Sequence, residues 1–337
     1  MPALAIADAL VTRGASVFFI GGERSERELV PAAGYELEQI DVRGLDRRNP
    51  LKAGAALARS ARATGDARAL LREHRTTAVL GAGGYVAGPV GLAAVSLRLP
   101  LVLCEADSHL GLTNRALAPL ARRVCLAFPL EGRDDPRYVV TGRAVPVARA
   151  DRGSARERYG LEADELMVLV FGGSLGARSI NQAALAGLDG ASFRVLHVTG
   201  TRDWPQLRGR ARSSLYELVE YLAPADFDVA LAASDLVVGR AGGSVFEIAA
   251  HGRPAILVPY PHATADHQSG NAAWMADGGA AVVIPDDELS GPRLASEVGR
   301  LIGDPARRAA MRRASRALAR PDAARAIAAE VLAVAHP

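Results

Sequence analysis

The segment GRAGGSVFE, residues 239–247, brings two adjacent glycines, a hydroxyl and a carboxylate together. The preceding ASDLVV is typical of a buried strand, and the following EIAAHG has the apolar spacing of a short helix that ends at glycine. We therefore expect a strand-to-helix turn, with the helix beginning near Gly243. There Gly242 and Gly243 would let the backbone approach a ligand, beside the hydroxyl of Ser244. Glu247 would accept both hydroxyls of a ribose or stabilise the first helical turn through the helix dipole, and both roles stay open.

Two further glycine-rich turns follow apolar, strand-like runs. GAGGYVAGP, residues 81–89, follows TAVL, and FGGSLGAR, residues 171–178, follows LMVLV. In open parallel sheets, ligands bind beyond the carboxyl ends of the strands, where glycine admits the ligand and helix N-termini attract anions. Three such turns, divided between two domains, predict a ligand cleft between the domains. In the second turn, Ser174 at an N-cap position and Arg178 one turn later suit a phosphate, and a simple capping serine is the alternative.

Polar side chains also gather in PHATADHQSGNAAWM, residues 261–275. His267, Gln268 and Asn271 stand at i, i+1 and i+4 at the start of an expected helix, which suggests hydrogen bonding to a sugar, whereas capping by Asp266 explains only part of the pattern. Neither G-x-x-x-x-G-K-[ST] nor a complete G-x-G-x-x-G occurs in the chain. The sequence therefore disfavours P-loop hydrolysis and binding of a nicotinamide dinucleotide.

The elements that must position these turns alternate along the whole chain. Short runs rich in β-formers, such as SVFFIG, LVLCE and FRVLHVTG, are separated by segments with apolar residues three and four apart. This pattern is typical of an α/β protein whose parallel sheets are covered by helices on both faces. We expect two doubly wound domains, at 1–150 and 151–320, followed by a C-terminal helix at 321–337. One arrangement for this helix is packing back on the first domain.

The first domain has an unusual start. The chain opens with the helical pattern PALAIADALVTRG, residues 2–14, whereas doubly wound domains usually open with a strand that feeds a glycine-rich turn into the first helix. We therefore expect that a piece of this domain is missing from the sequence.

Composition restricts the class of protein. The 337 residues are 49% hydrophobic and 23% charged, with a net charge of +3 and two cysteines, Cys104 and Cys125, each in an apolar run. These features predict a soluble protein with buried thiols in a reducing cytoplasm, without a signal peptide, a membrane span or a cysteine metal site. Positive charge concentrates on one helical segment, at Lys52, Arg59, Arg62, Arg68, Arg72 and Arg75. A solvated helix face or attraction to anionic headgroups or phosphate explains it better than nucleic acid does, because no aromatic residues interleave the charges.

Together these motifs resemble the MurG family, the UDP-N-acetylglucosamine:lipid I N-acetylglucosaminyltransferases of bacterial cell-wall synthesis. The resemblance covers nearly the whole chain and includes GAGGYVAGPVGLAA, GLTNR, FGGSLGARSIN, SDLVVGRAG and EIAAHGRPAILVPYPHATADHQSGNA. It implies a GT-B fold, two Rossmann-like domains facing across a cleft, with the nucleotide sugar held by the C-terminal domain and the lipid acceptor by the N-terminal one. It also implies an inverting transfer at the cytoplasmic face of the cell membrane, by a peripheral protein that needs no tightly bound metal or cofactor.

The resemblance further implies roles for individual residues. On the donor side, Glu247 would hold the ribose, Ser174 a phosphate oxygen, and Gly242, Gly243 and Ser244 would lie along the diphosphate, while His267, Gln268 and Asn271 would bind the N-acetylglucosamine hydroxyls. On the acceptor side, the resemblance points to Gly83, Gly84, Tyr85, Asp107 and Asn114. The basic helical segment would meet the membrane that carries lipid I.

The chain also departs from the family pattern. The family's opening strand and G-G-T-x-G-H loop, with a histidine proposed for catalysis, have no counterpart, because Pro2 corresponds to the proline after that loop. EADSHLG replaces the usual E-Q-N, which places Asp107 where a general base or a surface turn acid would stand. TGRAVP replaces G-N-P-V-R, so a phosphate contact would fall to Arg143. The stretch from Arg240 to Glu247 is one residue shorter than in the family, so we expect a tighter helix start with Gly243 absorbing the change.

Three other functions remain as alternatives. A UDP-N-acetylglucosamine 2-epimerase of the same fold would make UDP-N-acetylmannosamine from the donor alone. A glycosyltransferase of the same fold could use another lipid acceptor. A non-catalytic nucleotide-sugar-binding protein would bind the donor without transferring the sugar.

Overall fold

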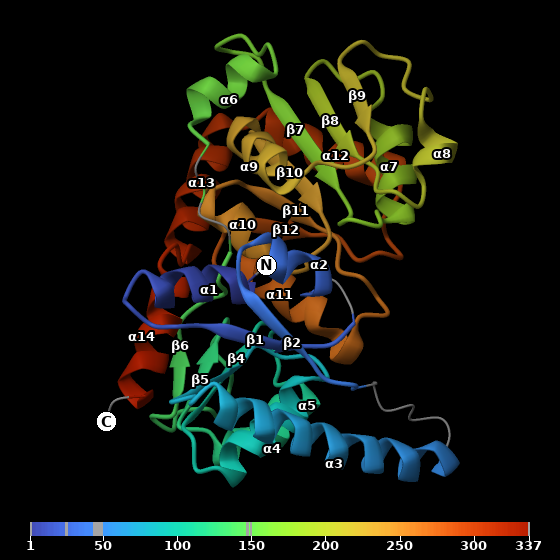
Figure 1. Ribbon diagram of the computed structural model, residues 1–337. Helices are drawn as coiled ribbons and strands as arrows, with labels where there is room; N and C mark the ends of the chain where they lie inside the picture. The colour runs from blue at the N-terminus through green and yellow to red at the C-terminus, as the bar shows by residue number, and fades with distance from the viewer. Residues whose placement is uncertain (1, 24–25, 43–49, 146–147, 149, 336–337) are drawn as a thin grey trace. The chain divides into compact units, whose positions relative to one another are not determined.

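The computed structural model describes residues 2–23, 26–42, 50–145, 148 and 150–335, with only the backbone for 50–58 and 264. The chain forms two compact units (Figure 1): unit 1 comprises Met1–Pro146 with Asp322–Pro337, and unit 2 comprises Val147–Pro321. Three residues next to the predicted domain boundary, at positions 146, 147 and 149, lie outside the described residues. The C-terminal helix therefore belongs to the same unit as the N-terminal residues.

Unit 2 contains one parallel sheet whose strands, among the described residues, run in the order β12-β11-β10-β7-β8-β9. The strand that comes first in this unit, β7, lies in the middle, as in a doubly wound fold. The strands are β7 (Met167–Phe171), β8 (Arg194–Val198), β9 (Tyr216–Val219), β10 (Leu236–Gly239), β11 (Ala255–Leu257) and β12 (Ala281–Val283). All five residues of β7 are buried, because helices cover both faces of this central strand.

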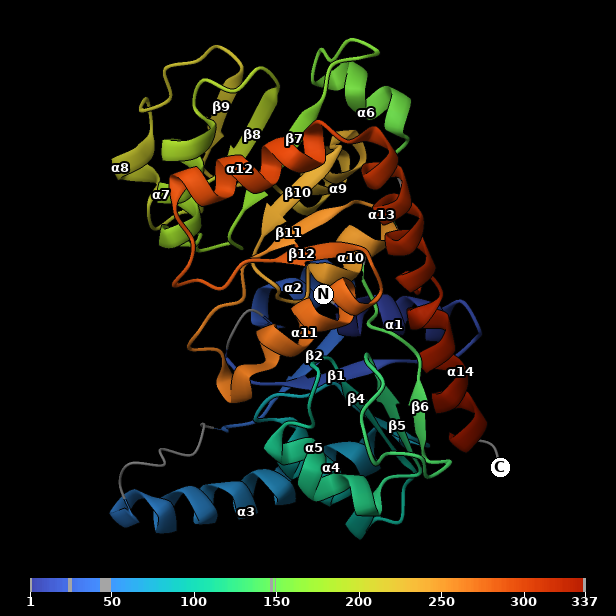
Figure 2. The same cartoon turned by 180° about the vertical axis from the view of Figure 1, so that it is seen from behind.

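Helices connect and cover these strands. Apolar residues of α7 and α12 pack together on one face of the sheet, against Val168, Val238 and their neighbours (Figure 2). The helices of unit 2 are α6 (Arg152–Arg158), α7 (Arg178–Leu188), α8 (Trp204–Leu207), α9 (Pro224–Ala233), α10 (Val245–Ala250), η2 (Thr264–Asp266), α11 (His267–Asp277), α12 (Gly291–Ile302) and α13 (Pro305–Leu318).

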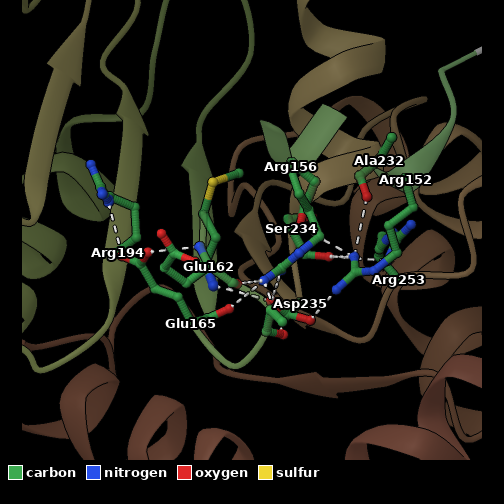
Figure 3. A network of polar contacts seen from close by, with 12 residues as sticks. Arg152, Arg156, Glu162, Glu165, Arg194, Ala232, Ser234, Asp235 and Arg253 are labelled. Atoms are coloured by element: carbon green, nitrogen blue, oxygen red, sulfur yellow. Dashed lines mark hydrogen bonds and ion pairs between the residues drawn. The ribbon is translucent and has the colours of Figure 1, made fainter. Parts of the chain in front are cut away.

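A polar cluster fixes the amino end of the sheet in unit 2 (Figure 3). The carboxylate of Asp235, the residue before β10, is almost fully buried and receives hydrogen bonds from Arg152, Arg156 and Arg312. It also accepts from the backbone N–H of Met167, at the start of β7. The neighbouring Arg253 is buried, and burial together with the charges of nearby arginines lowers its pKa to about 9. One carboxylate thus holds several guanidinium groups at the edge opposite the glycine turns.

Unit 1 has the same alternation of strands and helices but a divided sheet. Its described strands form a two-stranded parallel sheet, β1-β2, and a separate four-stranded parallel sheet, β3-β4-β5-β6. The strands are β1 (Phe18–Gly21), β2 (Glu36–Gln39), β3 (Val79–Gly81), β4 (Leu101–Glu105), β5 (Arg123–Leu126) and β6 (Tyr138–Val140).

Helices cover the two faces of unit 1 with separate apolar clusters. On one face, Ala63, Ala67 and Leu71 of α3 pack with α4, Leu101 and Leu103. On the other, Ile6 and Leu10 of α1 pack with Ile327 and Val331 of α14, the helix that returns from the end of the chain (Figure 2). The helices are α1 (Pro2–Val11), α2 (Glu26–Ala32), α3 (Pro50–Glu73), α4 (Ala87–Ser96), α5 (Leu112–Leu117), η1 (Ala118–Leu120) and α14 (Ala323–Ala335).

The observed architecture confirms the predicted fold class. Two strands were not predicted, β6 and β9, and both are outer strands of their sheets. Their sequences, YVV and YELV, are short and half-buried, so they lack the continuous apolar run of a central parallel strand. Cys125 is buried, Cys104 is half-buried, and both are free thiols.

Candidate functional site

The first turn at the carboxyl edge of unit 2 joins β7 to α7. Gly173 and Gly176 have positive φ values, and Gly176 donates its N–H to the carbonyl of Gly173. A Cβ on Gly176 would lie 1.9 Å from the carbonyl oxygen of Thr199. The backbone of the turn therefore lies directly against the backbone that follows β8, with no room for a side chain between them. Only glycine satisfies both the conformation and the space at this position.

The prediction that Ser174 caps the following helix is wrong. The helix α7 begins at Arg178, and its N-cap residue is Ala177. Ser174 lies instead at the exposed tip of the turn, where its carbonyl accepts a hydrogen bond from the N–H of Thr201. The glycines keep the chain out of helical conformation for three residues longer than the sequence pattern indicated. The exposed hydroxyl of Ser174 is open to solvent and is not used in capping.

Behind this turn lies a buried polar group that the sequence did not reveal. Asp203 contacts Arg178 and Arg202 and accepts a hydrogen bond from the side chain of Asn181. Burial alone would raise the pKa of Asp203, but the hydrogen bond and charge of Arg202, with those of its other partners, lower it below the ordinary value. Arg178 therefore lies at the start of α7, paired with a carboxylate and still largely exposed.

The second turn joins β10 to α10 and contains the glycine pair. The helix α10 begins at Val245, two residues later than predicted, and Glu247 is its third residue. Before it, the N–H of Val245 bonds to the carbonyl of Gly242, and that of Phe246 bonds to the carbonyl of Gly243. These bonds span three residues, as in a 3₁₀ turn, so the start is tight, as expected for the short spacing. Neither glycine of the pair is among the described glycines with positive φ, so the tight start does not require a left-handed backbone at Gly243.

Arg240 ties the loops around this turn together. Its guanidinium donates to the carbonyls of Val258 and Pro259, to Asp286 at 2.6 Å and to Ser179 at 2.8 Å. These partners follow β11 and β12 or begin α7, so one side chain joins four segments at the carboxyl edge. Sequence reasoning gave Arg240 no role, because its partners are far apart in the chain.

The helix α11 begins at His267, as predicted, and its first turns lie against the glycine pair. The amide Nδ2 of Asn271 donates to the carbonyl of Ala241, and its buried Oδ1 has no hydrogen-bond partner among the described residues. Gln268 accepts from the N–H of Tyr260, and its Nε2 lies 4.0 Å from where a Cβ on Gly242 would be. The structure therefore brings Gln268 and Asn271 against the turn that precedes Glu247.

The residues just before α11 have an uncommon backbone. Ala265 and Asp266 both have positive φ, near +50°, and neither is glycine. Asp266 occupies the N-cap position, but its carboxylate accepts from the hydroxyl of Ser269 and makes no cap to the backbone. A left-handed backbone at two consecutive residues other than glycine is strained, and strain of this kind is found most often at functional sites.

The corresponding edge of unit 1 contains the third glycine turn. Gly83 and Gly84, after β3, both have positive φ, and a Cβ on either would meet nothing within 4 Å. These two positions favour glycine because of their positive φ values, since the space around them would admit a side chain. Tyr85 follows with an exposed ring before α4 begins at Ala87.

The adjacent loop after β4 is organised by a buried carboxylate. Glu105 accepts hydrogen bonds from the N–H groups of Ala106, Asp107 and Gly111 and from Nδ2 of Asn114. Asn114 is buried in this network and faces the protein interior. Asp107 is half-buried, and its carboxylate makes no hydrogen bond or ion pair with the described residues. Arg143 reaches the same loop, with its guanidinium 3.4 Å from the carbonyl of Ala106.

The predicted residues thus form two groups, each within its own unit. Gly242, Gly243, Ser244, Glu247, Gln268 and Asn271 gather in unit 2, with Ser174 on the neighbouring turn after β7, which pairs with β10. His267 is half-buried at the start of the same helix as Gln268. Asp107 lies in the loop after β4, and Asn114 of α5 and Arg143, which follows β6, contact this loop or the end of β4. Among the described residues, the group with metal-ligand spacing is Glu36, Glu38 and His74, on β2 and after α3, away from both sets of turns.

Comparison with known proteins adds to this geometry. The N-terminal domain model of glycosyltransferase family 28 matches residues 1–126, and the C-terminal domain model matches residues 167–327. A protein of Moorella thermoacetica is 43% identical, over 97% of this chain and 93% of its own length. A protein of Halorhodospira halophila is 39% identical, over 99% and 95%. Both are named UDP-N-acetylglucosamine--N-acetylmuramyl-(pentapeptide) pyrophosphoryl-undecaprenol N-acetylglucosamine transferase.

Solved structures agree with this similarity. MurG of Acinetobacter baumannii superposes with a TM-score of 0.79 at 27% identity, covering 98% of this chain and 95% of that one. A UDP-N-acetylglucosamine 2-epimerase described as putative, from Listeria monocytogenes, has a TM-score of 0.70 at 17% identity, covering 99% and 94%. At that identity the second likeness supports the shared fold alone.

Proposed function

This chain belongs to the MurG family of glycosyltransferases, and we propose that it transfers N-acetylglucosamine from UDP-N-acetylglucosamine to the 4-hydroxyl of the N-acetylmuramoyl group of lipid I, giving lipid II for peptidoglycan synthesis. The observation that carries the proposal is the 43% identity to the Moorella thermoacetica enzyme over nearly the full length of both chains. The reaction makes the protein a hexosyltransferase of cell-wall biogenesis.

The donor binds at the carboxyl edge of unit 2 in this proposal. Glu247 accepts the ribose hydroxyls from the first turn of α10, and the tight turn at Gly242 and Gly243 exposes backbone to the diphosphate. Gln268 and Asn271 face the same turn from α11, where their amides can bind sugar hydroxyls. The exposed hydroxyl of Ser174 supplies a phosphate contact from the adjacent turn, and His267 completes the sugar side.

The chemistry in this proposal is an inverting displacement. The acceptor's 4-hydroxyl attacks the anomeric carbon, the bond to the diphosphate breaks, and UDP leaves with the electron pair. Backbone N–H groups of the glycine turns and the positive end of α7, with Arg178 in its first turn, stabilise the charge that develops on the leaving group. This electrostatic task requires no tightly bound metal or cofactor.

The acceptor approaches unit 1 in this proposal. Gly83, Gly84 and Tyr85 form an open, exposed turn. In the adjacent loop, the carboxylate of Asp107 has no hydrogen-bond or ion-pair partner among the described residues. A carboxylate within reach of the attacking hydroxyl can remove its proton. Asp107 is therefore the proposed general base, while Asn114 supports the loop through Glu105. Arg143, which follows β6, reaches this loop and is the proposed phosphate contact.

The protein works at a membrane surface in this proposal, because its acceptor is a lipid. No helix in the described part of the chain is long and apolar enough to cross a bilayer. Arg59, Arg62, Arg72 and Arg75 are exposed along and after α3, while Ala63, Ala67 and Leu71 face the core. The side chain of Lys52 lies outside the described residues. An exposed basic face of this kind attracts the anionic cytoplasmic leaflet.

An assay of the purified chain with UDP-N-acetylglucosamine and lipid I tests the function. We expect lipid II and UDP as products. Formation of UDP-N-acetylmannosamine from the donor alone would instead establish an epimerase, and donor binding without any product would establish a binding protein.

Substitution of Glu247 tests the donor site separately from turnover. We expect Glu247→Ala to weaken donor binding by about two to four orders of magnitude, because two charge-assisted hydrogen bonds are worth roughly 1.5–3 kcal/mol each. Glu217, an exposed acid on β9, provides a matched control as Glu217→Ala. Unchanged donor affinity in Glu247→Ala, measured by calorimetry, would rule out the ribose contact and leave the family assignment intact.

A further inference from the structure

Positive charge exceeds negative charge in the polar cluster at the amino end of the sheet in unit 2. Arg152, Arg156 and Arg312 all pair with one carboxylate, that of Asp235, at 2.5–3.3 Å. Arg253 is buried in the same cluster (Figure 3). Guanidinium groups keep their charge in proteins, so one carboxylate faces four positive charges.

The carboxylate of Asp235 has no acceptor position left for another donor. Its Oδ1 accepts from Arg152 and Arg312, and its Oδ2 accepts from Arg156 and from the backbone N–H of Met167. A carboxylate offers about four lone-pair positions, and all of them are used here. The remaining arginine therefore bonds elsewhere, to the carbonyl of the residue before Asp235 (Figure 3).

Three buried polar atoms in and beside this cluster have no hydrogen-bond partner among the described residues. They are Nε of Arg253, Nε of Arg312 and the hydroxyl oxygen of Ser315. Arg253 is 3% exposed and Ser315 is fully buried. Arg312 and Ser315 lie on α13, which packs against α10, and Arg253 comes just after α10. Because a buried donor without an acceptor costs free energy, this cluster lacks an acceptor.

Arg316 brings a further cation to the exposed side of the cluster. A Cβ on Gly252 would lie 2.4 Å from Cγ of Arg316 and 2.7 Å from its Nε, so this side chain crosses bare backbone next to Arg253. Burial, together with the charges of Arg152, Arg312 and Arg316, lowers the pKa of Arg253. The arginines of α13 therefore act electrostatically on the buried one.

We propose that this cluster binds a phosphate group, as the free ion or as a monoester. We call it the arginine site, and it consists of Arg253, Arg312, Ser315 and Arg316. A phosphate monoester carries roughly −1.5 to −2 charges at pH 7 and has three strong acceptor oxygens. It therefore offsets the excess charge and accepts from several of the unpartnered donors at once, whereas a water molecule brings no charge and a carboxylate brings one charge and two oxygens.

The arginine site is separate from the glycine turns of unit 2. Asp235 precedes β10 and Gly242 follows it, so the two sites lie at opposite ends of the same strand. A phosphate bound there would link α13 to the end of α10 and stabilise unit 2. This inference goes beyond the proposed function and does not depend on it.

Titration of the whole chain with inorganic phosphate tests the proposal. Calorimetry is done at constant ionic strength and with UDP in excess, so that the donor side is occupied. Arg316 is exposed, so Arg316→Gln is expected to fold, and it should weaken phosphate binding by about tenfold or more because a charge-assisted hydrogen bond is lost. Arg313→Gln is the matched control, since Arg313 is exposed on the same helix, on the side away from the buried Met311. It should change the affinity by less than about twofold.

Ser315→Ala separates phosphate binding from a purely structural role. Without phosphate, the melting temperature of this variant should equal or exceed that of the parent, because the lost hydroxyl has no partner among the described residues. Phosphate should then raise its melting temperature less than it raises that of the parent. The same rise in both proteins would remove the hydroxyl from the site.

Two results would overturn the proposal. One is the absence of phosphate binding by the folded parent chain, and the other is equal affinity in Arg316→Gln and Arg313→Gln. A second titration with glycerol 3-phosphate distinguishes the two sources of the phosphate group. Equal or tighter binding than that of inorganic phosphate supports a monoester, and weaker binding supports the free ion. None of these readouts uses transferase activity.

Discussion

In unit 2 the first strand, β7, lies inside one continuous sheet and is buried on both faces, whereas the described strands of unit 1 form two separate sheets, and β1 and β3 do not pair. The residues of β1 are mostly half-buried, and those of β7 are at most 4% exposed. Both units nevertheless form their glycine turns at the carboxyl edge. The comparison indicates that the two parts of the divided sheet in unit 1 are held by the helices that cover them, whereas in unit 2 the central strand joins both sides of the sheet through its own backbone hydrogen bonds.

The largest loss of stability is expected from a substitution at the amino end of the sheet in unit 2. We predict that Asp235→Ala destabilises unit 2 by about 3–5 kcal/mol, because it leaves buried guanidinium groups without their shared carboxylate. Denaturant unfolding, followed by hydrogen exchange of peptides from each unit, measures the loss. The exposed pair of Arg137 and Asp135 in unit 1 is the control, and Asp135→Ala should cost less than about 1 kcal/mol. Similar losses for the two variants would mean that Asp235 does not hold the sheet together.

Truncation of one leucine in each unit compares how tightly the two sheets are packed. We predict that Leu169→Ala, in the middle of β7, costs about 3 kcal/mol, because it leaves a cavity in a close-packed layer. Leu80→Ala, in β3 beside the cavity of about 540 Å³ that residues of β1 and β3 line, should cost about 1 kcal/mol, since it enlarges a cavity that already exists. The same unfolding measurement compares them. A cost for Leu80→Ala as large as that for Leu169→Ala would mean that unit 1 is packed as tightly as unit 2.

The sequence predicted the parts of this structure that depend on local pattern. Central strands such as β4, β7 and β10 are continuous apolar runs, and α11 begins at His267 as expected. The fold class followed from the alternation of these elements. The missed strands, β6 and β9, lie at sheet edges, where half-burial weakens the apolar signal.

Contacts between distant residues could not be predicted in this way. Arg240 joins segments after three strands to the first turn of α7, and Glu105 holds the loop that contains Asp107, yet no local sequence pattern identifies the partners of either residue. The starts of α7 and α10 were predicted too early, because a glycine turn can keep its own hydrogen bonds before the helix begins.

The glycine turns of the two units differ in why they require glycine, and one alanine substitution in each turn tests this difference. We predict that Gly176→Ala destabilises unit 2 by roughly 2–3 kcal/mol, because its methyl group would clash with the backbone of Thr199 as well as straining φ. Gly84→Ala should cost only the strain, about 1 kcal/mol, because the space around it is open. Thermal unfolding of both variants gives the comparison. Equal shifts would show that crowding at Gly176 is relieved by movement of the turn.

Acid should affect unit 2 through a histidine at its centre. His197 on β8 is fully buried between Tyr216 and Asn181, and burial lowers its pKa from 6.5 to about 3. The unfolded chain therefore takes up a proton below pH 6.5 that the folded chain does not, so stability falls as the pH drops from 6.5 towards 3. At pH 5 the loss relative to neutral pH is about 2 kcal/mol, from 1.36 kcal/mol per pKa unit. The variant His197→Gln cannot titrate, and its unfolding free energy should change less between pH 7 and pH 5, as measured by urea unfolding. An unaltered pH dependence in that variant would assign the acid sensitivity to other groups, of which His251 is the next, because burial lowers its pKa as well, in spite of the adjacent Asp228.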